Sequence, residues 1–187
     1  KFTALKYSNS LGTKLTVGLP EGHIWAGGAE IAGDGVEFVA NMPTEEIYTL
    51  PDRNRVDGLV YASKPLNYNG NLIEGICLEV KIGLAYAAYI EGKVVKASAT
   101  KGQEVLEQLL AMDEGACHLG EAALVPYNSP ISNSGILFYN TLFDENAACH
   151  LALGKAYPTC IQGGEKMNSV ELALHGVNDS LIHEDFM

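Results

Sequence analysis

Short apolar runs alternate with glycine-containing turns through the first half of the chain. The turn dipeptides supply the positive φ that the tip of a hairpin requires. We expect turns at Asn69-Gly70, at Glu91-Gly92, and at Asp34-Gly35, where a two-residue hairpin loop fits the flanking runs. Short strands with turns at such intervals predict an antiparallel, meander-like sheet.

Two helices are predicted in the second half of the chain. Thr100 and Gln103 have the spacing of a capping box, and a helical stripe of leucines follows towards Gly115. The second helix is expected to begin with Asp144 as its N-cap and to run to Tyr157, where a proline ends it.

Strands are expected between these helices, at 122–125 and 136–139. The whole pattern predicts an α+β fold, a mostly antiparallel sheet with a few packed helices. With 187 residues and no internal repeat or linker, the chain has the length for one domain, residues 1–187.

Charge and cysteine content limit which binding partners and which cellular compartment we expect. The formal net charge of −11 opposes nucleic acids and anionic membranes, and it suits cations or substrates that carry an amine. The longest apolar run, 82–90, is too short to span a bilayer. Four cysteines without a C-x-x-C pair fit no zinc ribbon and favour a reducing cytoplasm. We therefore expect a cytoplasmic protein that binds neither nucleic acid nor membrane.

Residues that could bind a metal gather in four segments: 41–46, 118–121, 144–150 and 178–185. In an extended strand, His183 and Asp185 point to one side, and on the predicted helix His150 and Tyr157 share a face. Imidazoles with several carboxylates favour zinc, cobalt or manganese, and an excess of carboxylates suggests two ions with a bridging carboxylate. The alternative is that the histidines are core residues and Glu45-Glu46 is a solvated turn.

Other catalytic chemistries have little support in the sequence. There is no G-x-S-x-G elbow for a serine nucleophile and no glycine-rich phosphate loop. Cys149 adjoins His150, but adjacent residues of a helix diverge by about 100°, so the predicted helix keeps the imidazole from activating the thiol.

At these same segments the chain resembles the catalytic half of the thermophilic metallo-aminopeptidases, the group of aminopeptidase T, aminopeptidase S and PepS. The motifs are Pro-Thr-Glu-Glu, Leu-Gly-Glu, Asp-Glu-Asn-Ala-x-x-His, Gly-Lys-Ala-Tyr and His-x-Asp-x-Met. The matching stretches are 41–49, 119–125, 141–150, 154–157 and 178–187. Their order along the chain makes the combination specific, although each motif alone is weak.

The resemblance implies a metal-dependent aminopeptidase that releases N-terminal residues from peptides by means of a hydroxide bound to two divalent ions, often cobalt, zinc or magnesium. Carried over by motif, Glu121 is the expected bridge between the ions and Tyr157 the active-site tyrosine. The implied metal ligands are Glu46, Glu121, Glu145, His150, His183 and Asp185.

The resemblance also implies a homodimer and a peptide substrate with a free N-terminus. Members of the family are longer, with an N-terminal domain before this region and a further stretch after it. The chain is therefore expected to be a fragment, whose activity without those parts is open. The competing hypothesis is a non-catalytic cation-binding or dimerisation module, in which the candidate ligands would be scattered.

Overall fold

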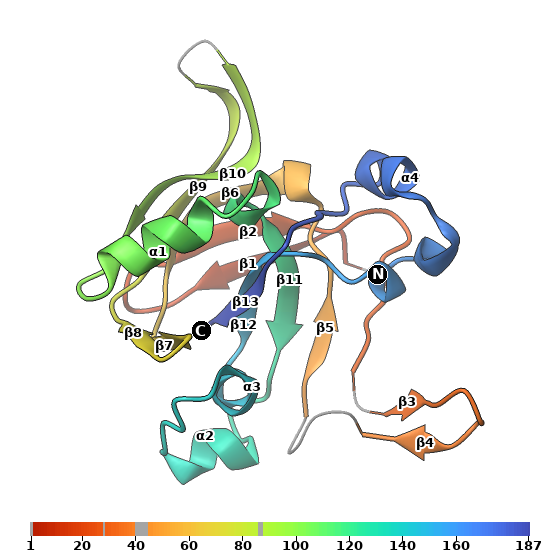
Figure 1. Ribbon diagram of the computed structural model, residues 1–187, viewed down its shortest axis with the longest axis horizontal. Helices are drawn as coiled ribbons and strands as arrows, with labels where there is room; N and C mark the ends of the chain where they lie inside the picture. The colour runs from red at the N-terminus through yellow and green to blue at the C-terminus, as the bar shows by residue number, and fades with distance from the viewer. Residues whose placement is uncertain (1, 28, 40–44, 86–87) are drawn as a thin grey trace.

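The computed structural model describes residues 2–27, 29–39, 45–85 and 88–187 and is built around two antiparallel sheets (Figure 1). The larger sheet has five strands in the order β1-β2-β6-β9-β10, and the smaller has four in the order β13-β12-β11-β5. The strands of the larger sheet are β1 (Ala4–Ser8), β2 (Lys14–Gly18), β6 (Val56–Tyr61), β9 (Cys77–Ala85) and β10 (Ala88–Ser98). Those of the smaller sheet are β5 (Ile47–Thr49), β11 (Leu119–Leu124), β12 (His150–Gly154) and β13 (His183–Phe186).

Short helices connect and flank the sheets. The α-helices are α1 (Gln103–Leu110), α2 (Pro130–Ser134), α3 (Thr141–Asp144) and α4 (Ser169–Leu174). The 3₁₀ turns are η1 (Arg53–Arg55), η2 (Gly115–Cys117), η3 (Glu145–Ala147), η4 (Pro158–Cys160) and η5 (Gly164–Lys166). Within the described ranges, no helix combines the length and the apolar character needed to cross a membrane. The α+β class, with mostly antiparallel sheet, is confirmed.

One hydrophobic cluster joins both sheets to α1. Leu78 of β9, Leu106 of α1 and Leu119 of β11 are completely buried in it, together with the nearly buried Leu151 of β12 and Phe186 of β13. Full burial of one such side chain stabilises a fold by about 1.5–3 kcal/mol. This shared core fixes the smaller sheet relative to the larger one.

Strand alternation then determines what the other face of the smaller sheet presents. Because side chains of a strand point alternately to its two faces, Leu151 and Phe186 in the core leave their neighbours on the opposite face. Those neighbours are His150 on β12 and Asp185 on β13, with His183 two residues before Asp185. Residues 183–185 are extended in β13, so His183 and Asp185 point to the same face of the sheet.

The glycine dipeptides form three different structures. Asn69-Gly70 is the two-residue loop between β7 (Leu66–Tyr68) and β8 (Asn71–Ile73), with φ of 49° and 80°. The hairpin predicted around Asp34-Gly35 is also present, as β3 (Glu30–Ile31) and β4 (Glu37–Phe38). Its loop is one residue longer than predicted, because the innermost backbone pair is Ala32 with Val36.

The turn predicted at Glu91-Gly92 is wrong. These residues lie within β10, where the pairing with β9 shifts between Ile90 and Lys93. Gly92 has a φ of 61°, and a Cβ on it would lie 1.9 Å from the carbonyl oxygen of Arg53. The glycine therefore makes a bulge against a neighbouring backbone, and the β9–β10 connection falls at 86–87, outside the described residues.

The first predicted helix exists but is shorter and starts differently. The N-cap of α1 is Gly102, with a φ of 75° and no side-chain cap. The capping box is wrong because both side chains have other partners. The hydroxyl of Thr100 donates to the carbonyl of Glu74 at 2.9 Å, and Gln103 accepts from the backbone N–H of Ala99 at 2.6 Å.

The helix predicted from Asp144 to Tyr157 is wrong. The chain makes one short helical stretch through α3 and η3 and then enters β12. This strand lies between β11 and β13 in the smaller sheet. Every residue of β12 is buried, and the residues after His150 form a short apolar run that periodicity cannot distinguish from a buried helix. The strand predicted at 136–139 is also wrong, since this segment is irregular backbone between α2 and α3.

Asp144 directly precedes η3, but its side chain makes no capping hydrogen bond. Its carboxylate is buried and accepts hydrogen bonds from the backbone N–H groups of Phe138 and Asn140, at 2.8 and 3.0 Å. The side chain thus stabilises the irregular segment before α3.

Candidate metal centre

The polar face of the smaller sheet brings four of the candidate ligands together. Strands β11, β12 and β13 are adjacent, and the register sets His183 opposite Gly154 and Asp185 opposite Ala152. Glu121 lies opposite the same Ala152 from the β11 side. A fifth ligand, Glu46, directly precedes β5, the strand on the far side of β11.

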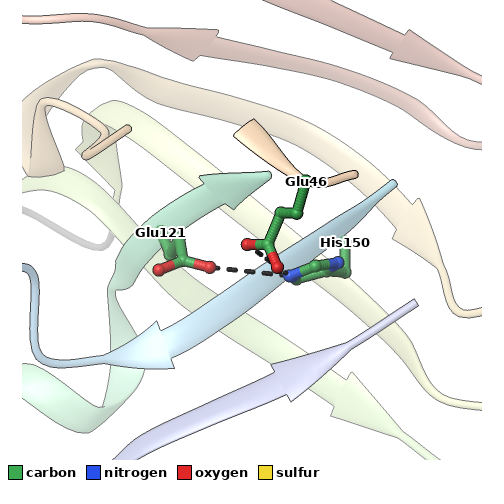
Figure 2. A group of neighbouring side chains, drawn as sticks. All are labelled: Glu46, Glu121 and His150. Atoms are coloured by element: carbon green, nitrogen blue, oxygen red, sulfur yellow. Dashed lines mark ion pairs between the residues drawn. The ribbon is translucent and has the colours of Figure 1, made fainter. Parts of the chain in front are cut away.

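His150 lies at the centre of the first group. Its Nε2 is 3.4 Å from Oε1 of Glu46, 3.5 Å from Oε1 of Glu121 and 3.9 Å from Oδ1 of Asp185. Figure 2 shows the carboxylates of Glu46 and Glu121 turned toward this nitrogen, Glu121 from β11 and Glu46 from the residue before β5. Glu46, Glu121 and His150 are all buried and could together hold one metal ion.

His183 lies at the centre of the second group. Its Nε2 is 3.7 Å from Oε2 of Glu121 and 3.7 Å from Oδ2 of Asp185. Each of these two carboxylates therefore turns one oxygen toward His150 and the other toward His183. Glu121, His183 and Asp185 form a second possible metal-binding group, and Glu121 belongs to both groups.

Backbone carbonyls orient both imidazoles. Nδ1 of His150 donates to the carbonyl of Ala148 at 3.1 Å, and Nδ1 of His183 donates to the carbonyl of Lys155 at 2.7 Å. In a neutral imidazole this places the only N–H on Nδ1 and leaves a lone pair on Nε2, directed at the carboxylates. A second hydrogen bond that fixes the tautomer is the usual accompaniment of a metal-ligating histidine.

The donor atoms fit a divalent cation. Nε2 of His150 and Oδ1 of Asp185 are buried and make no hydrogen bond. Two acceptors facing each other at 3.4–3.9 Å are unfavourable, and a cation between them satisfies both. Imidazole nitrogen with carboxylate oxygen is a donor set suited to zinc, cobalt or manganese. The residues present therefore fit the metal that the sequence predicted.

Burial and the proximity of several acids shift the pKa values of the residues in this cluster. Burial, followed by the charges of neighbouring carboxylates, raises the pKa of Glu121 and of Asp185 and raises that of Glu145 to about 9. Burial alone would lower the pKa of His150, but the adjoining Glu121 and Glu46 raise it well above its usual range. Without a cation, the site competes for protons to offset its negative charge.

Glu145 lies beside the two groups rather than within either of them. It belongs to η3, and burial, then the charge of Asp185, raise its pKa. Among the described residues, its carboxyl oxygens are not part of the two sets that converge closely enough for one ion. Its predicted role as a ligand stays a prediction.

Tyr157 reaches the centre from the segment between β12 and η4. Its ring centroid is 4.7 Å from that of His183, and burial, then the charges of Glu121 and Asp185, raise the pKa of its hydroxyl to about 12. The tyrosine therefore stays protonated beside the centre at neutral pH, as a hydrogen-bond donor requires. The predicted helix face shared by His150 and Tyr157 is wrong, because His150 lies on β12 and this strand ends at Gly154.

The Pro-Thr-Glu-Glu motif is only partly visible, since residues 41–44 lie outside the described residues. Its two glutamates differ: Glu45 is exposed, as a solvated turn predicts, whereas Glu46 is buried in the centre. Sequence reasoning missed the carbonyls of Ala148 and Lys155, because any residue can supply a carbonyl. It also missed Tyr48, which contacts Tyr157 and had only its position two residues after Glu46 as a signal.

The sequence matches the thermophilic metalloprotease (M29) family over residues 1–187. It is 50% identical over 186 residues to aminopeptidase AmpS of Bacillus subtilis (strain 168), covering 100% of this chain and 43% of that protein. It is 54% identical over 176 residues to aminopeptidase 2 of Geobacillus stearothermophilus, covering 94% of this chain and 40% of that protein.

The fold matches the solved structure of wild-type AmpT from Thermus thermophilus with a TM-score of 0.87 and 46% identity, over 100% of this chain and 43% of that one. The chain thus spans less than half the length of these relatives. Its full-length match to the family, its fold and its converging ligands agree. The chain belongs to the thermophilic metalloprotease (M29) family.

Proposed function

We propose that this chain forms the catalytic domain of a metal-dependent aminopeptidase, which hydrolyses N-terminal residues from peptides at a dinuclear metal centre. One observation carries the proposal: Glu121 turns one carboxylate oxygen to each of two imidazoles, and each imidazole is held in the tautomer that ligates metal. The names of the relatives, all aminopeptidases, support the reaction class.

The residues would divide between two ions that share one carboxylate. Glu46, Glu121 and His150 would hold the first ion, and Glu121, His183 and Asp185 the second. Glu145, on η3, is the remaining predicted ligand. Cobalt, zinc or magnesium remain the proposed ions. When bound, a pair of divalent cations polarises a carbonyl and lowers the pKa of a shared water to near neutrality.

The protein's own groups would do the rest. The excess of carboxylates over imidazoles gives the site a negative charge that favours the ammonium group of a peptide's free N-terminus. The hydroxyl of Tyr157, which stays protonated beside His183, would donate a hydrogen bond to the peptide oxygen as that oxygen becomes negative. The carbonyls of Ala148 and Lys155 keep both imidazoles oriented through the reaction.

Two further parts of the proposal are a homodimer, which the resemblance to the family supports, and a cytoplasmic location, which the cysteine content supports. The free cysteines Cys77, Cys117, Cys149 and Cys160 are compatible with a reducing compartment. The alternative of a non-catalytic module predicted scattered ligands, whereas five of the six candidates converge among the described residues.

The experiment that tests the proposal begins with the chelator-stripped chain, titrated in a calorimeter with cobalt and with zinc. We expect about two ions per chain and proton release on binding. The metal-loaded chain should hydrolyse leucyl peptides and leave N-acetylated versions of the same peptides intact. One ion per chain would contradict the dinuclear centre. Equal cleavage of blocked and free peptides would contradict the aminopeptidase assignment.

A further inference from the structure

The side chain of Tyr157 needs support to act on a substrate. It follows β12 on a connecting segment immediately before η4, and it is 41% exposed. A half-exposed aromatic side chain on a connection retains rotational freedom unless other groups pack against it. Misplacement of a reacting group by about 1 Å can cost on the order of a hundredfold in rate.

Two aromatic rings contact Tyr157. The imidazole of His183 lies 4.7 Å away between centroids, at an interplanar angle of 44°. The ring of Tyr48 lies 6.1 Å away at 65°, in an edge-to-face arrangement. Both distances are in the range in which aromatic pairs attract each other beyond simple burial.

Tyr48 is itself firmly held. Its backbone exchanges two hydrogen bonds with Ala26, of 2.8 and 2.9 Å, and on the other side it pairs with Ala123 of β11. Its side chain packs against a second hydrophobic cluster. The buried members of this cluster are Leu50, Ala156, Cys160, Ile161 and Val177.

This cluster connects Tyr48 to the segment that carries Tyr157. Ala156 and Cys160, which flank Tyr157 in sequence, belong to it and are 0% and 1% exposed. Tyr48 also lies two residues after Glu46, at the strand that positions this ligand. Neighbouring residues at β5 thus contribute the Glu46 carboxylate to the centre and the Tyr48 ring to the contact with Tyr157.

We propose that Tyr48 is a positioning residue, which holds the ring of Tyr157 against His183 and so keeps the Tyr157 hydroxyl at the reacting peptide bond. The inference rests on the proposed function only for its consequence in catalysis. The contact itself can be tested without activity. A purely structural role for Tyr48 would affect stability and leave the position of Tyr157 unchanged.

The first test is a proton NMR measurement on the metal-free chain. A ring at the distance of Tyr157 displaces the imidazole resonances of His183, and Tyr157→Leu defines their position without that ring. We expect Tyr48→Leu to shift them toward the Tyr157→Leu position, and Tyr48→Phe, which keeps a ring, to leave them unchanged. Tyr127→Leu removes a tyrosine that is 92% exposed and serves as the control. Unchanged His183 resonances in Tyr48→Leu would overturn the proposal.

The second test is a double-mutant cycle on the metal-loaded chain, with a leucyl peptide as substrate. Tyr48→Leu should lower kcat about tenfold to a hundredfold and retain the metal content of the unmodified chain. In a Tyr157→Phe background it should cause no further loss, because the hydroxyl that Tyr48 positions is already absent. Independent, multiplicative losses would show that Tyr48 does not act through Tyr157.

The two tests separate the inference from the function on which it rests. If the chain does not hydrolyse peptides, the proposed function fails, and the His183 resonances still decide whether Tyr48 holds Tyr157. If Tyr48→Leu does not fold, Tyr48→Met replaces it, because the flexible thioether fills irregular space without supplying an aromatic ring. A folded Met variant with unmoved His183 resonances would equally overturn the proposal.

Discussion

The five-stranded sheet buries aliphatic side chains against α1, whereas the four-stranded sheet also buries carboxylates and imidazoles on its other face. In the first region the interior stabilises the fold, as with Leu78 and Leu106, which are completely buried. In the second, His150 and Asp185 contribute buried polar atoms that make no hydrogen bond. The five-stranded sheet therefore contributes stability. The four-stranded sheet instead keeps a buried nitrogen and a buried oxygen without hydrogen bonds, available to a metal ion, at a cost in stability.

The largest expected effect comes from breaking the shared carboxylate. Glu121→Gln should remove at least one ion and reduce peptide hydrolysis by more than about a thousandfold, because both ligand groups lose a member. In the metal-free chain the same change removes a buried acid from among other acids, so the melting temperature should rise. Metal content and thermal unfolding measure the two effects. Glu165→Gln, an exposed acid on η5, is the matched control. Two ions retained in Glu121→Gln would contradict the bridge.

The second-largest effect is expected in the five-stranded sheet, from a variant that changes stability and not metal binding. Leu78→Ala should lower the free energy of unfolding by about 2–5 kcal/mol, through lost burial and the cavity left behind. Chemical denaturation measures this loss. The number of ions bound should stay the same. Leu174→Ala, at a position 82% exposed, should change stability little. A loss of metal in Leu78→Ala would show that the two regions are less separate than the core suggests.

A smaller effect is expected at the edge of the metal centre. Tyr157→Phe removes one hydroxyl and no ligand, so both ions should remain, while kcat falls about a hundredfold. Steady-state kinetics and metal analysis on the same sample separate the two quantities. An unchanged kcat would rule out the hydrogen bond from Tyr157 in the reaction.

The smallest effect concerns two buried histidines with opposite surroundings. His150 faces carboxylates, which raise its pKa, whereas burial and then the charges of Arg53 and Lys93 lower the pKa of His118 to about 4. Below the ordinary value of 6.5, the unfolded chain takes up a proton at His118 that the folded chain refuses. The contribution of His118 to stability is thus present above pH 6.5 and decreases as the pH falls toward 4.

We expect the unmodified chain to lose about 1–2 kcal/mol more than His118→Gln when the pH falls from 7 to 5. Denaturant titrations at both pH values measure the difference. His175→Gln, at an exposed histidine, should follow the unmodified chain. Parallel pH dependence in His118→Gln and the unmodified chain would contradict the lowered pKa.

Local signals in the sequence predicted part of the local structure. The hairpins at Asn69-Gly70 and around Asp34-Gly35 depend on short-range geometry and are confirmed, whereas the capping box at Thr100 is wrong. Glu91-Gly92 has the same chemistry as a hairpin tip, but the backbone of Arg53 packs against it and makes it a bulge. The sequence does not reveal such a distant neighbour.

The region around His150 shows why the candidate site was harder to predict. The apolar residues that follow His150 are compatible with a helix or with a strand. They form a strand because β11 and β13 pair with it on either side. The ligand motifs could be named from the resemblance, but their convergence depends on sheet register. Glu121 and Asp185 meet because both face Ala152 from opposite sides, which no spacing along the chain indicates.

The candidate ligands come from β11, β12, β13 and the residue before β5, which are distant from one another in sequence. The two ligand groups thus form only when these strands have paired, late in folding, because long chain segments must close first. A metal ion cannot nucleate this fold as it does in a short zinc-binding loop. We therefore expect the refolding rate to be independent of metal concentration, and the bound ions to act afterwards by slowing unfolding.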